Sequence, residues 1–212
     1  MSKHKVHSLA GDLAGLYRVI LADPPWSYRN GGNGAAKNHY PTMTTAGICA
    51  LQVAGRAVGE LAAPDCVLLL WGTWPLVPDA LRVMEAWGFA YVSGFPWVKL
   101  QDPPLVELFD AGQAKPTYGT GFWVRGCSEY VFIGRRGQPQ RPAGAFLGLL
   151  SERFPHSRKP ENIYQYAEAM AGPYLELFAR RRRPGWVSWG NELADHTTPG
   201  TENLSQLPDP TL

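Results

Sequence analysis

Residues 17–26 read YRVILADPPW, and this stretch decides the class of fold expected for the chain. Its apolar, β-branched first part, Tyr17–Ala22, predicts a buried strand. The prolines after Asp23 end that strand abruptly, because proline has no backbone N–H to donate and is excluded from the interior of a helix or central strand. The sequence therefore predicts a strand whose carboxyl end opens directly into a loop.

Outward from this strand, helix and strand patterns alternate along the chain. Apolar residues at helical spacing and proline or glycine at the ends predict helices over 45–61, 78–87 and 160–171. Apolar runs predict strands over 66–71, at two places within 90–99, and over 129–133 and 174–178, with a last element over 185–191. A basic loop is expected over 134–144. The alternation predicts an α/β fold, and the continuous apolar run over 66–71 is typical of a sheet covered on both faces.

The charge balance limits how the chain can bind a nucleic acid. Its 212 residues include 20 Lys+Arg and 18 Asp+Glu, a formal net charge of +2. This balance excludes a histone-like protein that is basic over its whole surface, so nucleic-acid contact requires a local patch. Three basic groups would form one if they met at a single crevice: Arg135, Arg136 and Arg141; Arg153, Arg158 and Lys159; and residues 180–183.

Cysteine and histidine spacing gives no sign of a metal site or a disulfide framework. Cys49, Cys66 and Cys127 lie far apart, and the five histidines lack ligand spacing. The sequence has neither a signal-peptide pattern nor an apolar run of membrane-spanning length. We expect a cytoplasmic protein with no metal and no membrane contact. Without an interior linker, one domain is expected over 1–194, with a flexible tail over 195–212.

The loop after the first strand carries groups that suit an exocyclic amino group. Open α/β sheets bind ligands at the carboxyl ends of their strands. The Asp23 carboxylate and the Pro24 carbonyl accept hydrogen bonds and donate none, so they match the two N–H groups of such an amine. Trp26 adds a flat face on which an unstacked base can lie. A proline-rich turn with an exposed tryptophan is the alternative interpretation.

Asp23-Pro24-Pro25-Trp26 resembles the DPPW motif of the N6-adenine methyltransferases typified by the catalytic subunit of the eukaryotic mRNA adenosine methyltransferase. That family includes bacterial and phage members. Other segments resemble its motifs and follow in family order: YPTM at 40–43, LWGT at 70–73, WVK at 97–99, GTGFW at 119–123 with Arg125 and Glu129, HSRKPE at 156–161, ELFAR at 176–180 and GNE at 190–192. Their order and spacing carry the resemblance further than DPPW alone.

The resemblance implies a Rossmann-like methyltransferase that uses S-adenosylmethionine, with permuted motif order and helices on both faces of a mixed sheet. The missing G-x-G-x-x-G after the first strand agrees with that order. The implied catalytic residues are Asp23, Pro24, Pro25 and Trp26. The implied cofactor contacts are Asp23, Lys159, Phe178, Arg180, Asn191 and Glu192. The implied substrate contacts are Trp26, Tyr28, His39, Tyr40, Lys99 and Arg125.

Some of these assignments have alternatives. Lys159 also fits a solvated lysine at a helix start, and Phe178 also fits core packing. The family's upstream acidic contact to the cofactor has no clear counterpart, and Asp12 is the candidate. A run of four arginines is also typical of a solvated strand end.

The function implied by the resemblance is methylation of the N6 amino group of adenine in DNA, with the base flipped into the DPPW pocket. A small module without the extension and zinc fingers of the mRNA enzyme favours a bacterial or phage enzyme, and with it DNA. Three alternatives stay open: adenine in RNA, a non-catalytic subunit of a methyltransferase heterodimer, and an amino group on a protein or small molecule. Homodimers and heterodimers are both compatible with the sequence.

Overall fold

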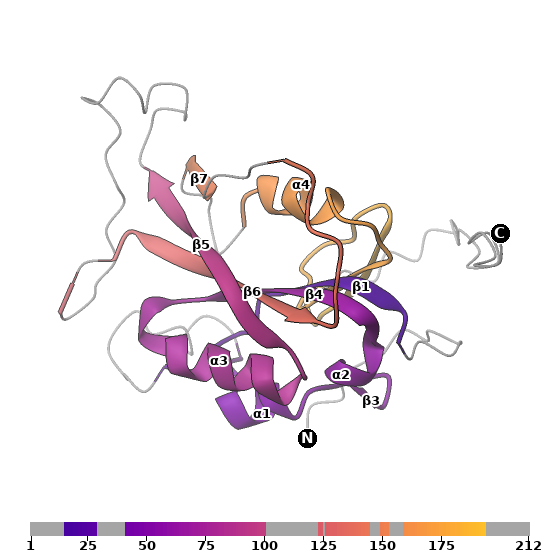
Figure 1. The fold of residues 1–212 in the computed structure, drawn as a ribbon. Coiled ribbons are helices and arrows are strands. Elements are labelled where there is room, and N and C mark those ends of the chain that lie inside the picture. The colour runs from indigo at the N-terminus through magenta and orange to yellow at the C-terminus, as the bar shows by residue number, and fades with distance from the viewer. Residues whose placement is uncertain are drawn as a thin grey trace.

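The computed structural model describes residues 15–28, 41–100, 123–124, 126–144, 149–152 and 159–193. Seven of its strands form one sheet: β1 (Tyr17–Ala22), β4 (Ala62–Gly72), β5 (Ala90–Leu100), β6 (Ser128–Arg136), β7 (Leu149–Glu152), β8 (Tyr174–Leu177) and β9 (Trp186–Trp189). Their order across the sheet is β7-β5-β6-β4-β1-β8-β9 (Figure 1).

β1 lies inside the sheet, parallel to β4 on one side and to β8 on the other. β6 is antiparallel to both β4 and β5, so the sheet is mixed. After β4 the chain adds β5, β6 and β7 on one side of β1, and then β8 and β9 on the other. This reversal makes a topological switch point at the carboxyl ends of β1, β4 and β8, the place where α/β sheets bind ligands.

Helices cover both faces of this sheet, as Figure 1 shows for α1 and α3 on one face and α4 on the other. Alternate residues of β1 point to the two faces: Ile20 packs in the core with α1, α2 and α3, whereas Val19 and Leu21 pack with α4. The predicted fold class is thereby confirmed. The helix bounds are Thr45–Cys49 for α1, Val58–Leu61 for α2, Val77–Ala86 for α3 and Asn162–Glu168 for α4.

The prediction of one helix over 45–61 is wrong. Between α1 and α2 the chain forms a short hairpin of β2 (Gln52–Val53) and β3 (Arg56–Ala57). Ala54 and Gly55 at its turn have φ values of 51° and 79°, the left-handed conformation that a tight hairpin turn requires. The apolar residues that suggested a helix are nevertheless in the core: Ile48, Leu51, Val58 and Leu61.

The other differences concern where elements end. β6 is longer than predicted because it pairs with β4 from Cys66–Arg136 to Gly72–Tyr130, and it therefore takes the first part of the expected basic loop. β4 begins earlier than predicted, at Ala62, which pairs with Tyr17 of β1. The two strand signals within 90–99 belong to one strand, β5, and α4 is shorter than 160–171. β7 was not predicted. The predictions of β1, α3, β8 and β9 are confirmed apart from their ends.

Arg136 connects three segments at one end of the sheet. Its guanidinium donates hydrogen bonds to the carbonyl oxygens of Gly59 at 2.5 Å, Trp87 at 3.0 Å and Gly88 at 3.3 Å. These carbonyls belong to α2 and to the segment after α3. A single charged side chain thus satisfies backbone groups of two elements that pack on the same face.

This position also corrects the hypothesis of one basic rim. Arg136 pairs with Cys66 across β4 and β6, whereas Gly72, at the carboxyl end of β4, pairs with Tyr130. Six residues of strand separate the two places, roughly 20 Å at the rise of a β-strand. Arg136 therefore lies at the opposite end of the sheet from the DPPW loop and takes no part in a patch around it.

We predict that Arg136→Ala lowers the free energy of unfolding by about 1–3 kcal/mol, because backbone acceptors of two elements lose a charged donor. Urea unfolding followed by circular dichroism measures the change. Arg135→Ala is the matched control, since the exposed Arg135 makes a 3.3 Å hydrogen bond to Gln138, and its effect is expected within about 0.5 kcal/mol. Equal losses in the two variants would contradict the anchoring role of Arg136.

Candidate active site

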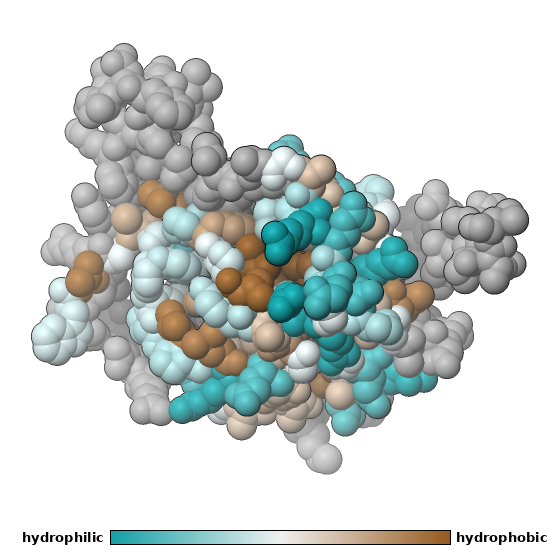
Figure 2. All heavy atoms as spheres, viewed as in Figure 1, coloured by the Kyte–Doolittle hydropathy of each residue, from teal (hydrophilic) through white to brown (hydrophobic). Residues whose placement is uncertain are grey.

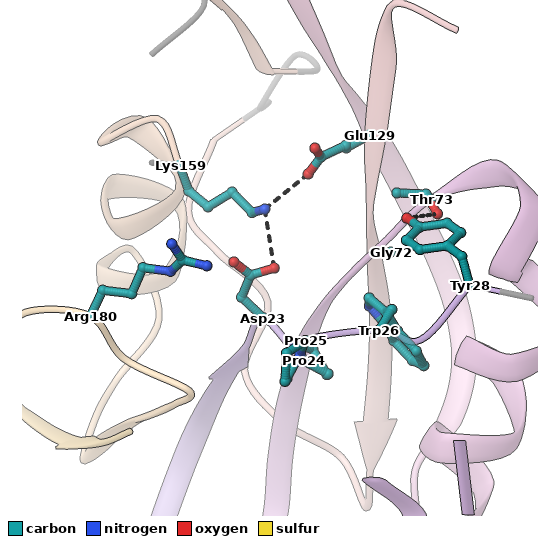
Figure 3. Close-up of a pocket in the computed structure, with 10 residues that line it drawn as sticks. All are labelled: Asp23, Pro24, Pro25, Trp26, Tyr28, Gly72, Thr73, Glu129, Lys159 and Arg180. Atoms are coloured by element: carbon teal, nitrogen blue, oxygen red, sulfur yellow. Dashed lines mark hydrogen bonds and ion pairs between the residues drawn. The ribbon is translucent and has the colours of Figure 1, made fainter. Parts of the chain in front are cut away.

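A pocket opens at the carboxyl ends of β1 and β4, beside the start of β6 (Figure 3). It is an open depression whose empty space is about 460 Å³ when the adjoining solvent is included. Because these strand ends meet at the switch point, residues far apart in the sequence line one space. The lining residues are Asp23, Pro24, Pro25, Trp26, Tyr28, Gly72, Thr73, Glu129, Lys159 and Arg180.

Backbone hydrogen bonds fix the shape of the DPPW loop. The Trp26 N–H donates to the Pro24 carbonyl at 2.8 Å, which closes a tight turn around Pro25. The Met43 N–H donates to the Pro25 carbonyl at 2.8 Å, and the Ser27 N–H donates to the Met43 carbonyl at 3.1 Å. A carbonyl oxygen has two lone pairs, so Pro24 has the capacity to accept one further hydrogen bond from a ligand.

Trp26 is a buried residue of the DPPW loop that fixes the loop to β4. Its side chain is 6% exposed, and its Nε1 donates to the Trp71 carbonyl at 3.0 Å. The interpretation as a turn with an exposed tryptophan is therefore wrong. Most of the ring face that the sequence suggested for stacking is covered by the core, and contact of Trp26 with a base stays a prediction.

Lys159 lies between two carboxylates at the centre of the site (Figure 3). Its Nζ is 3.1 Å from Oδ1 of Asp23 and 2.9 Å from Oε2 of Glu129, and 5.0 Å from the centroid of the Trp71 ring. The other oxygen of Glu129 pairs with Lys99. Since the Lys159 side chain is only 15% exposed, its interpretation as a solvated lysine is wrong.

Burial and charge shift the three pKa values in different ways. Burial raises the pKa of Asp23 above its ordinary value, and Lys159 offsets only part of that effect. Burial also acts to raise the pKa of Glu129, but Lys159 and Lys99 together hold it below its usual range. For Lys159, burial opposes the charge, yet Asp23 and Glu129 raise its pKa and keep it protonated. Asp23 is thus the less compensated carboxylate, with the higher affinity for a proton.

Arg180 extends the site toward the end of β9. It lines the pocket, and its guanidinium lies 3.5 Å from Oε2 of Glu192. Asn191, between Glu192 and β9, is exposed. The chain after β9 passes close to the backbone of Ala179. Gly190 makes this possible, because a Cβ there would overlap the carbonyl oxygen of Ala179. Of the residues implied as cofactor contacts, Arg180 thus lines the pocket and Glu192 pairs with it, whereas Asn191 is next to Glu192 in the chain and does not line the pocket.

Phe178, another residue implied as a cofactor contact, lies outside the lining of the pocket. It lies in the turn after β8 with a φ of 63°, and its ring packs edge-on against Trp189 at 5.7 Å between centroids. It is half-buried against the core and does not line the pocket, so packing accounts for its position and its contact with a cofactor stays a prediction.

The implied substrate contacts differ in their distance from the pocket. Tyr28 lines it, with its hydroxyl 2.8 Å from Oγ1 of Thr73, whereas Lys99 is connected to it through Glu129. His39, Tyr40, Arg125 and the upstream candidate Asp12 lie outside the described residues.

Arg181 and Arg183 bind α4 and the residue before it. The guanidinium of Arg183 contacts both oxygens of Glu168, at 2.8 and 3.2 Å, and lies 4.3 Å from the ring of Tyr164. Arg181 pairs with Glu161. Figure 2 shows hydrophilic residues gathered over this side of the molecule. Acidic partners compensate much of the charge of the four-arginine run, which therefore contributes less to a phosphate-binding surface than its composition suggests.

Glu129 and Thr73 line the pocket but were not predicted as site residues. Glu129 entered the sequence analysis only as part of a motif segment. Thr73 follows from a signal that the sequence contains, because it comes directly after the apolar run of β4, and the carboxyl ends of parallel strands such as β1 and β4 lie at the same edge of the sheet. Glu129 stands at the start of its apolar run and reaches this edge only because β6 is antiparallel to β4, which the local pattern does not indicate.

The part of the chain that the structure describes contains no group of three or more His, Cys, Asp or Glu residues placed to hold a metal ion. Within the same residues, no helix is long and apolar enough to cross a membrane.

The fold and the pocket together define an α/β protein with an aspartate- and proline-containing loop at the switch point of its sheet. The chain belongs to the MT-A70 family, whose profile matches residues 17–192. This family of N6-adenine methyltransferases is the one that the sequence motifs resemble, and that prediction is confirmed. The match begins with β1 and ends at Glu192, so it includes every described residue that lines the pocket.

Individual relatives share between a quarter and a third of their residues with this chain. It is 29% identical over 207 residues to the type II methyltransferase M.MunI of Mycoplasma sp, covering 85% of this chain and 79% of that protein. It is 28% identical to an MT-A70-like N(6)-adenosine-methyltransferase of Arabidopsis thaliana, covering 89% and 25%. It is 29% identical to the human N(6)-adenine-specific methyltransferase METTL4, covering 84% and 37%. The chain thus spans most of M.MunI and only a quarter of the plant protein.

We predict that Glu129→Gln lowers the free energy of unfolding at pH 7 by about 1–3 kcal/mol, because two lysines lose a charged partner. The pKa of Glu129 is lowered in the folded state, so its contribution is present above the ordinary pKa of glutamate and is lost as the pH falls through the folded value. Urea unfolding from neutral to acidic pH should show the difference from wild type shrinking. A pH-independent difference would contradict the assignment.

We predict that Asp23→Asn changes the free energy of unfolding with the opposite pH dependence. Because the pKa of Asp23 is raised, its stabilising contribution is present below the ordinary pKa of aspartate and is lost as the pH rises through the folded value. At pH 7 the substitution should leave the protein as stable as wild type or more stable.

Proposed function

We propose that this protein transfers a methyl group from S-adenosylmethionine to the N6 amino group of adenine in DNA, with the base turned out of its stack into the pocket at the DPPW loop. The observation that carries the proposal is the pair of acceptors at the end of β1, the Asp23 carboxylate and the Pro24 carbonyl. The N6 amino group of adenine has two N–H groups that can donate to these acceptors. Guanine has a carbonyl oxygen in the same position, which donates no hydrogen bond.

These acceptors suit the chemistry of an aromatic amine. The N6 lone pair is delocalised into the ring, so the nitrogen is a weak nucleophile while it stays planar. Hydrogen bonds to Asp23 and Pro24 draw the amino group toward tetrahedral geometry and stabilise the positive charge that develops on it. The raised pKa of Asp23 then suits its carboxylate to accept the proton that N6 loses. The ion pair with Lys159 holds that carboxylate in one orientation.

Residues of the pocket and of the segment after β9 carry groups that complement those of S-adenosylmethionine, which has a sulfonium, an ammonium, a carboxylate and a ribose diol. When bound, the cofactor supplies an electrophilic methyl group and is left as a neutral thioether. Asp23 complements its positive charges, Lys159 and Arg180 its carboxylate, and Asn191 and Glu192 its hydroxyls. We therefore assign these five residues to the cofactor, with Phe178 packing against its adenine.

DNA is the first candidate because the chain spans 79% of the type II methyltransferase M.MunI. RNA is the second, since the Arabidopsis relative is named an adenosine methyltransferase. The proposal includes one catalytic domain over 1–194 with a tail over 195–212, a cytoplasmic location, and action as a homodimer or a heterodimer. A transfer assay with labelled S-adenosylmethionine on unmethylated DNA and RNA, followed by nucleoside analysis, tests it. Label in DNA as N6-methyladenine is expected; label only in RNA, or in neither polymer, would overturn the proposal.

We predict that Asp23→Ala lowers methyl transfer at least about 100-fold, because the developing charge loses its principal acceptor. The fold should persist, since Asp23 lies in a loop beyond the last residue of β1. Turnover with labelled cofactor measures the first effect, and the thermal unfolding midpoint checks the second. Retained activity in a folded variant would remove Asp23 from the mechanism.

We predict that Asn191→Ala raises the dissociation constant for S-adenosylmethionine about tenfold, the effect of losing one hydrogen bond to a ligand. Isothermal titration calorimetry measures this constant directly. Gln165→Ala, which removes an exposed amide from α4, is the control and should bind as wild type does. An unchanged constant for Asn191→Ala would contradict the cofactor assignment.

A further inference from the structure

Trp74 is an exposed aromatic side chain next in the chain to a residue of the pocket. It directly follows Thr73, which lines the pocket. Its Nε1 donates a hydrogen bond to Oγ of Ser128 at 3.1 Å, and Ser128 directly precedes Glu129, another lining residue. Both backbone segments that hold the indole thus belong to the wall of the pocket, while 53% of Trp74 remains exposed.

The indole packs at one end of a row of aromatic side chains on β6 and β5. Trp74 meets Tyr130 edge-on with 3.8 Å between centroids, and Tyr130 stacks on Phe132 at 5.8 Å. Phe132 in turn contacts Tyr91 at 6.2 Å. Turning the indole would break its N–H bond to Ser128 and its contact with Tyr130. The ring is therefore ordered before any ligand arrives, which reduces the entropy lost on binding.

The two ends of this row differ in their relation to the pocket. Tyr91 is 52% exposed, similar to Trp74, but it pairs with Gly134, four residues along β6 from Tyr130. That distance is roughly 13 Å at the rise of a strand. Of the two exposed rings at the ends of this row, Trp74 is therefore the nearer one to the pocket.

The chemistry of such a ligand follows from what the pocket takes. If an adenine within a polynucleotide enters the pocket, its removal deprives the neighbouring base of a stacking partner. An immobile, exposed indole restores that contact, and it does so for any base because every base has a flat π-face. We propose that Trp74 is the stacking platform for the unpaired nucleobase next to the target adenine in a single-stranded segment. This inference rests on the proposed function, since it requires a polynucleotide substrate.

Binding measurements test the platform separately from catalysis. The probes are fluorescently labelled single-stranded DNA oligonucleotides with one adenine, intact or with an abasic site directly 5′ or 3′ of it, and the readout is fluorescence anisotropy. We expect Trp74→Ala to raise the dissociation constant for intact DNA by roughly 5- to 100-fold, the range for loss of one base–aromatic stack. For wild type, an abasic site on the stacked side should weaken binding similarly, and for Trp74→Ala it should change little further.

Two variants make the result specific. Trp74→Phe keeps a flat ring and should retain most of the affinity. Tyr91→Ala removes an aromatic side chain of similar exposure from the far end of the row and should bind DNA as wild type does. The thermal unfolding midpoint of each variant checks that the fold is intact.

The outcomes separate this inference from the proposed function. Equal binding by wild type and Trp74→Ala, an abasic effect that persists unchanged in Trp74→Ala, or no binding of DNA by wild type overturns the platform. Binding that depends on Trp74 without methylation of any adenine supports the platform and overturns the proposed function. Methylation of adenine with binding independent of Trp74 supports the proposed function and overturns the platform.

Discussion

The site depends on the position of Lys159 between Asp23 and Glu129. These residues come from the loop after β1, the start of β6 and the segment before α4, so one ammonium group connects three separate parts of the chain. Without it, two carboxylates would face each other in a partly buried space, at a considerable electrostatic cost. Glu129 has Lys99 as a second partner, whereas Asp23 must share Lys159. Burial raises the pKa of Asp23, and the charge of Lys159, which Glu129 also uses, offsets only part of that effect.

The two ends of the sheet differ in how their polar groups contribute to stability. At one end Arg136 satisfies backbone carbonyls of α2 and of the segment after α3, an arrangement that contributes to stability. At the other end the strands open into a loop rich in acceptors, where burial of Asp23 opposes its charge. A functional site of this kind reduces the stability that its residues would otherwise provide. Parallel strands bring about this division, because all of their carboxyl ends lie at the same edge.

Two tryptophans at the pocket illustrate how context decides the role of a residue type. Trp26 belongs to the DPPW motif, yet its ring is largely buried and its N–H is bonded to the Trp71 carbonyl, so it supports the loop. Trp74 lies outside that motif, directly after Thr73, and half of its surface is exposed. Both satisfy their N–H donors, as buried or fixed indoles do. Of these two, Trp74 is the one with a ring left open to solvent.

The sequence by itself determined β1, the acceptor loop at its end, the alternation of strands and helices, and the family. The apolar residues on which the helix over 45–61 was predicted, Ile48, Leu51, Val58 and Leu61, are all in the core, although they do not lie on one helix. Only the tertiary structure decided that a hairpin separates those residues, that Trp26 is covered, that Glu129 completes the site and that Arg136 lies far from it. Each of these depends on which strands become neighbours and in what register, and pairing between distant segments leaves little trace in the local pattern of either one.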